Sequence, residues 1–193
     1  HPYQWPTIGL ELQHVQDATL TDVENFFYKY YRPNNAILTI SGGISADNAL
    51  QLAKKWFGDI PSGEPFNRNI AMEPEQQAAK FQHVKKDVPV NVIYKAWKMP
   101  GRIEPLYYAT NLLSDVLGLG ESSRLQHALK KETKLFTDIA AYITGSIDTG
   151  MFIITGKLAE GITYEQAEQG IQQELDKIKQ APITDAELTR VKN

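Results

Sequence analysis

The sequence predicts an α+β fold of two similar units, each a mixed or antiparallel sheet with helices on one face, with the first unit truncated. Three observations support this prediction. Apolar residues recur at helical spacing behind typical helix starts, β-branched and aromatic runs end at glycine or proline, and the two kinds of segment do not alternate regularly. Irregular alternation favours antiparallel pairing over a doubly wound parallel sheet.

The first third of the chain predicts two helices around one short strand. Thr19 and Asp22 form a capping-box-like start, and the helix behind them ends before Pro33. The apolar residues 36–40 predict a buried strand, and Ser45 then caps a second helix. The apolar faces comprise Leu20, Val23, Phe26, Phe27 and Tyr30 in the first helix and Ala46, Ala49, Leu50, Ala53, Trp56 and Phe57 in the second.

A polar stretch without periodicity divides the chain. Residues 63–80 contain Pro65 and Pro74 and predict a linker between residues 1–62, the end of the first unit, and residues 81–193, the second unit. The chain opens without Met and stops soon after its last helix begins. We therefore expect both ends to be cut points within a longer protein.

The second unit predicts three strands and four helices. The strands are expected at residues 88–99, 138–144 and 150–158, the last two as a hairpin. The helices are expected at residues 106–117, from Ser122 through Leu129, from Thr163 through Ile178, and from Thr184 onwards. Residues 37–60 and 151–178 share the order strand, glycine, capping residue, helix, which predicts that the two units are similar.

Composition excludes several classes of partner. The net charge is −3 without a long run of one sign, so nothing favours nucleic acid or an anionic membrane surface. The longest apolar runs are far shorter than the roughly 18 residues of a membrane span. The absence of cysteine excludes thiol catalysis and disulfides, and it leaves the compartment open.

The histidines do not form a zinc-binding pattern. They are His1, His14, His83 and His127. None is expected to have another His or a carboxylate at the three- or four-residue helical spacing that a zinc site uses. Glu132 follows His127 by five residues, which on an α-helix puts the two side chains on different faces. We therefore expect no metal ligand and no catalytic residue in this chain.

Arg124 falls in the first turn of a predicted helix, where the helix macrodipole disfavours a cation by roughly 0.3–1 kcal/mol. A compensating group is expected, either a carboxylate in a structural ion pair or the backbone of a partner. Arg124 is therefore predicted to be a structural or interface residue.

Several landmarks resemble, in their order, the pitrilysin/insulinase family of zinc peptidases, which includes the mitochondrial processing peptidases. The chain opens with His1-Pro2-Tyr3-Gln4-Trp5-Pro6-Thr7-Ile8-Gly9 and continues with Tyr31-Arg32-Pro33-Asn34-Asn35-Ala36. Trp56-Phe57-Gly58-Asp59-Ile60-Pro61 and Gly120-Glu121-Ser122-Ser123-Arg124-Leu125 follow. The resemblance covers essentially the whole chain.

This resemblance implies repeated α+β units, with two half-molecules that enclose a chamber for unfolded peptide. It also implies an inverted zincin motif, His-x-x-Glu-His, and a further Glu about 70–80 residues later, both upstream of His1. No residue of this chain matches those ligands. The resemblance therefore implies zinc for the full-length parent and no cofactor bound by this fragment.

The family also suggests a substrate-binding pair. Many members place an Arg, and seven residues later a Tyr, after the Ser-Arg-Leu helix, and this pair holds substrate. The matching positions here are Lys130 and Thr137. Lysine keeps a donor, whereas threonine can neither reach nor stack as tyrosine does, so both are weak candidates.

The sequence thus predicts the non-catalytic portion of a zinc metalloendopeptidase, which forms scaffold and chamber wall for a peptide substrate. The expected partner is an opposing half-molecule or a homodimer mate. The alternatives are a fragment of a catalytically inactive member that serves as a structural or assembly subunit, and an unrelated binding module with a contiguous exposed patch. The parent is expected to be an enzyme, and this chain alone to be inactive.

Truncation has a predicted consequence for the first unit. Its sheet edges and apolar helix faces are expected to be exposed around Phe26, Phe27, Ile40 and Trp56. Such a surface favours self-association or rearrangement.

Overall fold

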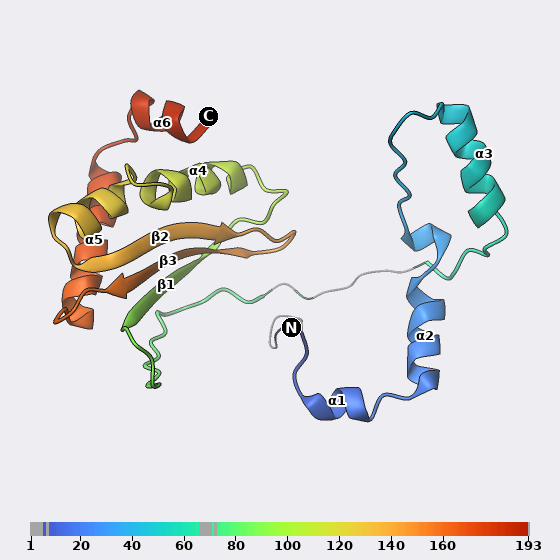
Figure 1. Ribbon diagram of the computed structural model, residues 1–193, viewed down its shortest axis with the longest axis horizontal. Helices are drawn as coiled ribbons and strands as arrows, with labels where there is room; N and C mark the ends of the chain where they lie inside the picture. Colours follow the sequence, from blue (N-terminus) through green and yellow to red (C-terminus); the bar gives the residue numbers. More distant parts are fainter. Residues whose placement is uncertain (1–5, 7, 66–70, 72, 193) are drawn as a thin grey trace. The chain divides into compact units, whose positions relative to one another are not determined.

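The computed structural model describes residues 6, 8–65, 71 and 73–192. The chain divides into two units, His1–Glu73 and Pro74–Asn193, which are treated separately below. Figure 1 labels the helices and strands of both.

Unit 1 is helical in its described residues. Its elements are α1 (Leu12–Gln16), α2 (Leu20–Tyr30), the 3-10 helix η2 (Pro33–Asn35) and α3 (Ala46–Phe57). The predicted caps are confirmed: Thr19 and Asp22 form a complete capping box on α2, and the Ser45 hydroxyl accepts a hydrogen bond from the backbone N–H of Asn48 at the start of α3. None of these helices contains a buried residue.

The prediction of a buried strand at residues 36–40 is wrong. These residues have no regular secondary structure, and all of them are exposed. A strand requires backbone hydrogen bonds to a neighbour, and no strand is present in the described part of unit 1 to supply them. The predicted similarity between residues 37–60 and 151–178 is therefore limited to the capped helix.

Unit 2 is an α+β layer, as predicted. Its elements are β1 (Val92–Met99), α4 (Tyr107–Gly118), the π-helix η3 (Gln126–Glu132), β2 (Phe136–Thr144), β3 (Gly150–Leu158), α5 (Tyr164–Gln180) and α6 (Asp185–Lys192). The three strands form an antiparallel sheet in the order β1-β3-β2. β1 starts four residues later than expected, because residues 88–91 form a loop.

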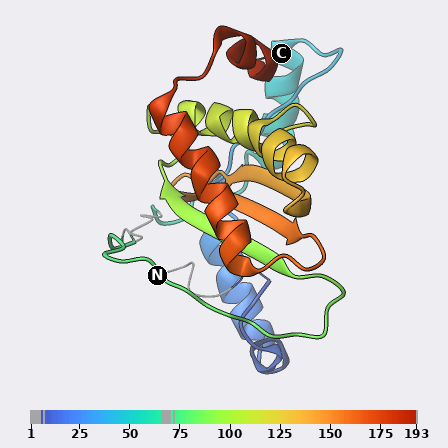
Figure 2. The same ribbon diagram turned by 90° about the vertical axis from the view of Figure 1, so that its left-hand side faces the viewer.

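The helices of unit 2 pack on one face of the sheet. Ile139 and Ala141 of β2 and Ile154 of β3 point to this face and lie in one buried cluster with Leu117 of α4 and Ile171 of α5. Figure 2 shows α5 crossing the strands. All fully buried apolar side chains of the described residues belong to unit 2, so the core of the described chain lies there.

The helix expected after Ser123 adopts an unexpected winding. From Gln126 to Glu132 it is a π-helix, and the Thr133 N–H donates to the carbonyl of Ala128, five residues earlier, at 3.0 Å. The Gln126 side chain donates from Nε2 to the carbonyl of Ile139 on β2, which fixes this helix against the outer strand.

No helix in residues 6, 8–65, 71 and 73–192 is long and apolar enough to cross a membrane.

Candidate functional site

The second face of the sheet in unit 2 is open. Side chains alternate between faces along a strand, so the register assigns Tyr94, Ala96, Ile153, Thr155, Met151, Ala140 and Tyr142 to the side opposite the helices. Tyr94 is 69% exposed and Tyr142 is 41% exposed. The result is an uncharged surface with aromatic rings on both outer strands, which we call the open sheet face.

Charged side chains lie at the ends of the open sheet face. Lys98 on β1 stands opposite Met151 on β3 and donates from Nζ to the carbonyl of Pro74 at 2.6 Å. Lys157 stands opposite Asp138 at the other end, with 3.9 Å between Nζ and Oδ2. A one-sided sheet with an apolar, aromatic middle suits contact with an extended peptide, because tyrosine rings offer both apolar area and a hydroxyl.

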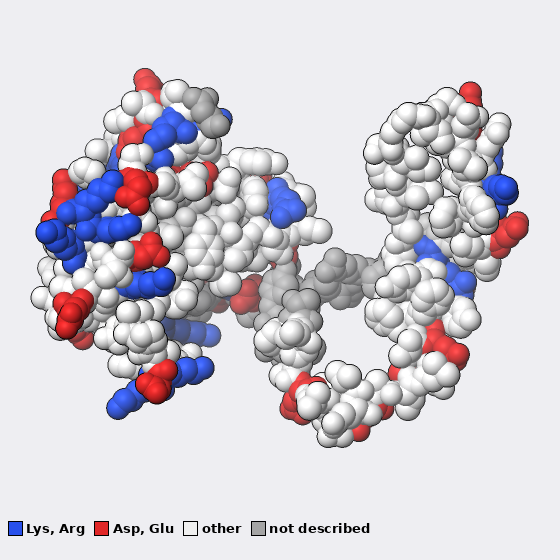
Figure 3. All heavy atoms as spheres, in the orientation of Figure 1, with Lys and Arg blue, Asp and Glu red and all other residues white. Residues whose placement is uncertain are grey.

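Unit 1 also exposes a large apolar surface, as predicted. Phe26 is 58% exposed and Trp56 is 68% exposed, and Phe27 and Ile40 are exposed as well. Figure 3 shows mostly uncharged atoms over α2 and α3, with Lys, Arg, Asp and Glu at the margins. Apolar surface of this extent marks an interaction region.

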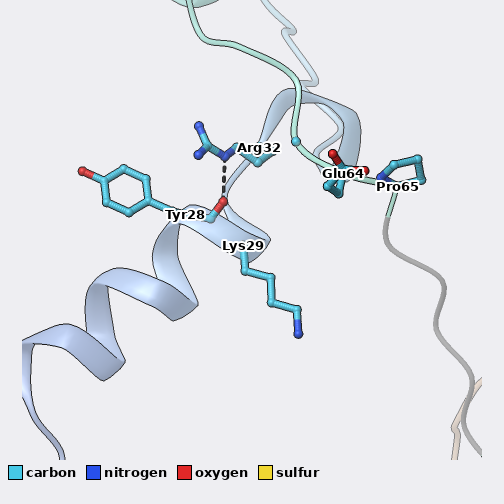
Figure 4. A pocket seen from close by; sticks show the side chains of 6 residues that line it. Tyr28, Lys29, Arg32, Glu64 and Pro65 are labelled. Atoms are coloured by element: carbon cyan, nitrogen blue, oxygen red, sulfur yellow. Dashed lines mark hydrogen bonds between the residues drawn. The ribbon is translucent and has the colours of Figure 1, made fainter.

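A shallow pocket in unit 1 was not predicted from the sequence. Figure 4 shows Tyr28 and Lys29 from the end of α2, Arg32 at the start of η2, and Glu64 and Pro65 on the other side. Arg32 donates from Nε to the carbonyl of Tyr28 at 2.7 Å, and its guanidinium lies 5.4 Å from the Tyr28 ring centre. In Figure 4 the labelled side chains do not converge on a common point.

The described residues do not fit a zinc ion. They contain no group of three or more His, Cys, Asp or Glu side chains close enough to hold a metal. His1 lies outside the described residues. The ring of His83 lies 5.6 Å from the ring of Tyr164 at a steep angle, an aromatic contact and not a ligand set. His14 in α1 has Glu11 and Asp17 three residues away on either side, so the expectation that no histidine has a carboxylate at this spacing is wrong.

The expectation that His127 and Glu132 lie on different faces is wrong. The distance between His127 Nδ1 and Glu132 Oε1 is 3.4 Å. The π-helix makes hydrogen bonds between residues five apart, so residues at that spacing come onto the same side. Both side chains are exposed, and the pair offers only two donors where a structural zinc site needs four.

Lys130 and Thr137 have separate partners. Lys130 Nζ lies 3.3 Å from Glu121 Oε1, and Lys131 Nζ lies 3.2 Å from Glu121 Oε2. Hydrogen bonds from Lys131 and Lys130 lower the pKa of Glu121. Thr137 lies where the β2–β3 register shifts and donates from Oγ1 to the carbonyl of Lys157 at 3.3 Å. The two candidates do not form a clamp with each other.

Arg124 meets a carboxylate from the same chain. Its Nε lies 2.6 Å from Glu187 Oε1 and its Nη2 2.8 Å from Glu187 Oε2, a bidentate pair with side chains 19% and 24% exposed. The hydrogen bond from Arg124 is the main cause that lowers the pKa of Glu187 to about 2. Sequence reasoning predicted the need for a compensating group but not which residue supplies it.

Unit 2 is a helix-backed antiparallel sheet with one open face. Comparison with known families identifies the class of domain: residues 17–193 match the peptidase M16 inactive domain. The chain belongs to this family. The predicted resemblance to pitrilysin/insulinase-type zinc peptidases is thereby confirmed.

Individual relatives are zinc proteases. The zinc protease PqqE of Helicobacter pylori is 29% identical over 195 aligned residues, which cover 100% of this chain and 44% of the relative. The uncharacterized zinc protease YmxG of Bacillus subtilis is 25% identical and covers 100% of this chain and 46% of its own length. The chain therefore spans about half the length of the curated relatives it matches.

Solved structures share the fold. A protease from Helicobacter pylori has a TM-score of 0.86 at 30% identity, covering 100% of this chain and 47% of that protein. The peptidase M16 inactive domain from Pseudomonas fluorescens has a TM-score of 0.85 at 22% identity, covering 100% of this chain and 46% of that one.

Proposed function

We propose that this chain is the part of a zinc metalloendopeptidase that does not hold the metal, and that it forms scaffold and one wall of a chamber for peptide. The observation that carries the proposal is the match of residues 17–193 to the inactive domain of the M16 peptidases. Zinc chemistry belongs to another part of the parent, where the metal would activate the water that attacks the peptide bond.

Two structural features support this proposal. The open sheet face offers an uncharged surface between Tyr94 and Tyr142, which suits an unfolded peptide in extended conformation. The exposed apolar faces of α2 and α3, which include Phe26 and Trp56, suit burial against further protein. The partner in the proposal is an opposing half-molecule or a second copy of the parent.

The alternative is a domain of a catalytically inactive relative that acts as an assembly subunit. Lys130 and Thr137 do not distinguish the two functions. Thr137 donates a hydrogen bond to the Lys157 carbonyl within the sheet, and Lys130 donates one to Glu121. The two functions differ in what stands outside this chain, namely whether the parent carries His-x-x-Glu-His.

The test is zinc-dependent cleavage of a fluorogenic peptide, measured for the 193-residue chain and for a polypeptide extended at its N-terminus. We expect cleavage by the extended form only, abolished by a chelator and restored by zinc. If the extended form lacks His-x-x-Glu-His and cleaves nothing, the assembly-subunit function is favoured. Cleavage by the 193-residue chain alone would contradict the proposal.

A further inference from the structure

The connection between α4 and η3 is a sharp break in the helical backbone. α4 ends at Gly118, and helical residues resume after Ser123. Gly120 has a φ of +79°, in the left-handed region, and the Ser123 N–H donates to the Gly120 carbonyl at 3.1 Å. One short turn does not by itself fix the angle between two helices, so other contacts have to set it.

α6 supplies a polar contact on each side of this break. Before the break, Arg190 donates to the carbonyl of Leu119 at 2.9 Å and to that of Asp115 at 3.5 Å. After the break, Glu187 accepts the two hydrogen bonds from Arg124. Glu187 and Arg190 stand three residues apart and therefore share one face of α6.

Both contacts join charges to helix ends. Arg190 donates to the carbonyl of Leu119, the residue after α4, and also to the carbonyl of Asp115, which already accepts from the Leu119 N–H. Arg124 lies in the first helical turn after the break, where a cation is disfavoured without a counter-charge. Glu187 supplies that charge, and the carboxylate of buried Glu174 adds to the attraction.

The same carboxylate holds α6 itself together. Glu187 Oε2 accepts from the backbone N–H and the hydroxyl of Thr184, each at 2.9 Å, in the capping box that starts α6. α6 has only eight residues, and a helix of that length is marginal in water without tertiary contacts. Loss of the Arg124–Glu187 pair therefore weakens both the docking and the folding of α6.

We propose that α6 is a brace with two polar contacts, one of them an ion pair, that fixes η3 relative to α4, and that detachment of α6 loosens η3. Glu121 lies within the braced break and pairs with Lys130 and Lys131 of η3. Detachment of α6 therefore also releases the ammonium groups of these two lysines. This conformational coupling goes beyond the scaffold role and holds whether or not the parent is a peptidase.

Hydrogen–deuterium exchange of the 193-residue chain tests the brace, with the variants Arg124→Gln and Arg190→Gln. Each variant removes one of the two contacts. We expect exchange to rise about three- to tenfold in residues 185–192 and also in residues 121–133, with residues 154–158 of β3 unchanged. Lys179→Gln is the matched control, because it removes an exposed ion pair with Asp176 at the end of α5 and should change neither segment.

An increase in exchange confined to residues 185–192 would show that α6 does not stabilise η3, and it would overturn the proposal. An unchanged exchange rate in both segments would also overturn it. If Arg124→Gln also raises exchange in β3, the whole unit is destabilised, and Glu187→Gln is then the variant that decides. That variant keeps an oxygen to cap Thr184 and loses only the charge, and the same joint rise in both segments is required of it.

Discussion

At the residue scale, the ionisation of Glu187 gives unit 2 a defined acid sensitivity. Hydrogen bonds from Arg124, followed by those of Thr184, hold the pKa of Glu187 at about 2, below the ordinary value of 4.5. A carboxyl whose pKa is lowered by folding stabilises the folded state fully above the unfolded pKa. The stability that the ionised Glu187 carboxylate contributes to the folded state is therefore lost as the pH falls from about 4.5 towards 2.

We predict that Glu187→Gln lowers the free energy of unfolding by about 1–2 kcal/mol at pH 7, after allowance for solvent screening of a partly exposed pair. The difference between variant and parent should shrink towards zero as the pH approaches 2. Urea unfolding at a series of pH values measures this difference. A difference independent of pH would mean that the charge of Glu187 contributes nothing, and Glu160→Gln in an exposed turn is the control.

Gly118 is required by close packing between α4 and β2. A Cβ at this position would lie 2.0 Å from the backbone nitrogen of Ala141 and 2.7 Å from its Cα. We predict that Gly118→Ala destabilises the protein by about 1–3 kcal/mol, because backbone has to move to relieve the overlap. Gly43→Ala is the control, since nothing lies within 4 Å of its added Cβ. Equal unfolding free energies for the two variants in urea would contradict this account.

Residues whose role depends on near neighbours in sequence could be predicted, and others could not. The capping residues Thr19, Ser45 and Thr163 act within three positions, so the local sequence predicted them. Glu187 stands 63 residues from Arg124, and only the packing of α6 brings them together. The sequence predicted that Arg124 requires a compensating group, but no local pattern identified Glu187 as the residue that supplies it.

At the element scale, the open sheet face is the surface that we propose contacts peptide. We predict that the double variant Tyr94→Ser/Tyr142→Ser weakens binding of a fluorescent, unfolded peptide about five- to tenfold, because two exposed aromatic contacts are lost. Fluorescence anisotropy measures the affinity. The far-ultraviolet circular dichroism should stay unchanged, since both rings are exposed.

Tyr108→Ser provides a matched control for this experiment. Tyr108 on α4 is 69% exposed, the same fraction as Tyr94, but it does not belong to the open sheet face. An equal loss of affinity in the control would indicate that any exposed tyrosine contributes, and the open sheet face would lose its assigned role.

Helices and strands could be predicted where their hydrogen-bond partners lie close to them in the sequence. The predicted hairpin of β2 and β3 is confirmed. It could be predicted because both strands and their connection lie within residues 136–158. Residues 36–40 have the apolar composition of a strand but no partner strand in the described part of unit 1. The π-helix η3 also escaped prediction, because apolar spacing at three and four residues does not distinguish it from an α-helix.

At the scale of the whole molecule, the exposed apolar faces of unit 1 make self-association the expected behaviour of the isolated chain. We predict that Phe26→Ser/Trp56→Ser shifts the chain towards monomer, because these two side chains are largely exposed on α2 and α3. Sedimentation velocity over a range of concentrations measures the shift. Phe81→Ser, which removes an exposed ring outside both helices, should have little effect. A compact monomer at every concentration would contradict this prediction.

The central claim is that the metal and the hydrolytic chemistry belong to another part of the parent, and zinc stoichiometry tests it most directly. Elemental analysis of the 193-residue chain after dialysis against micromolar zinc should find well below one tightly held ion per chain, with no peptide turnover. One zinc ion per chain that survives dialysis, together with peptide cleavage, would contradict the account.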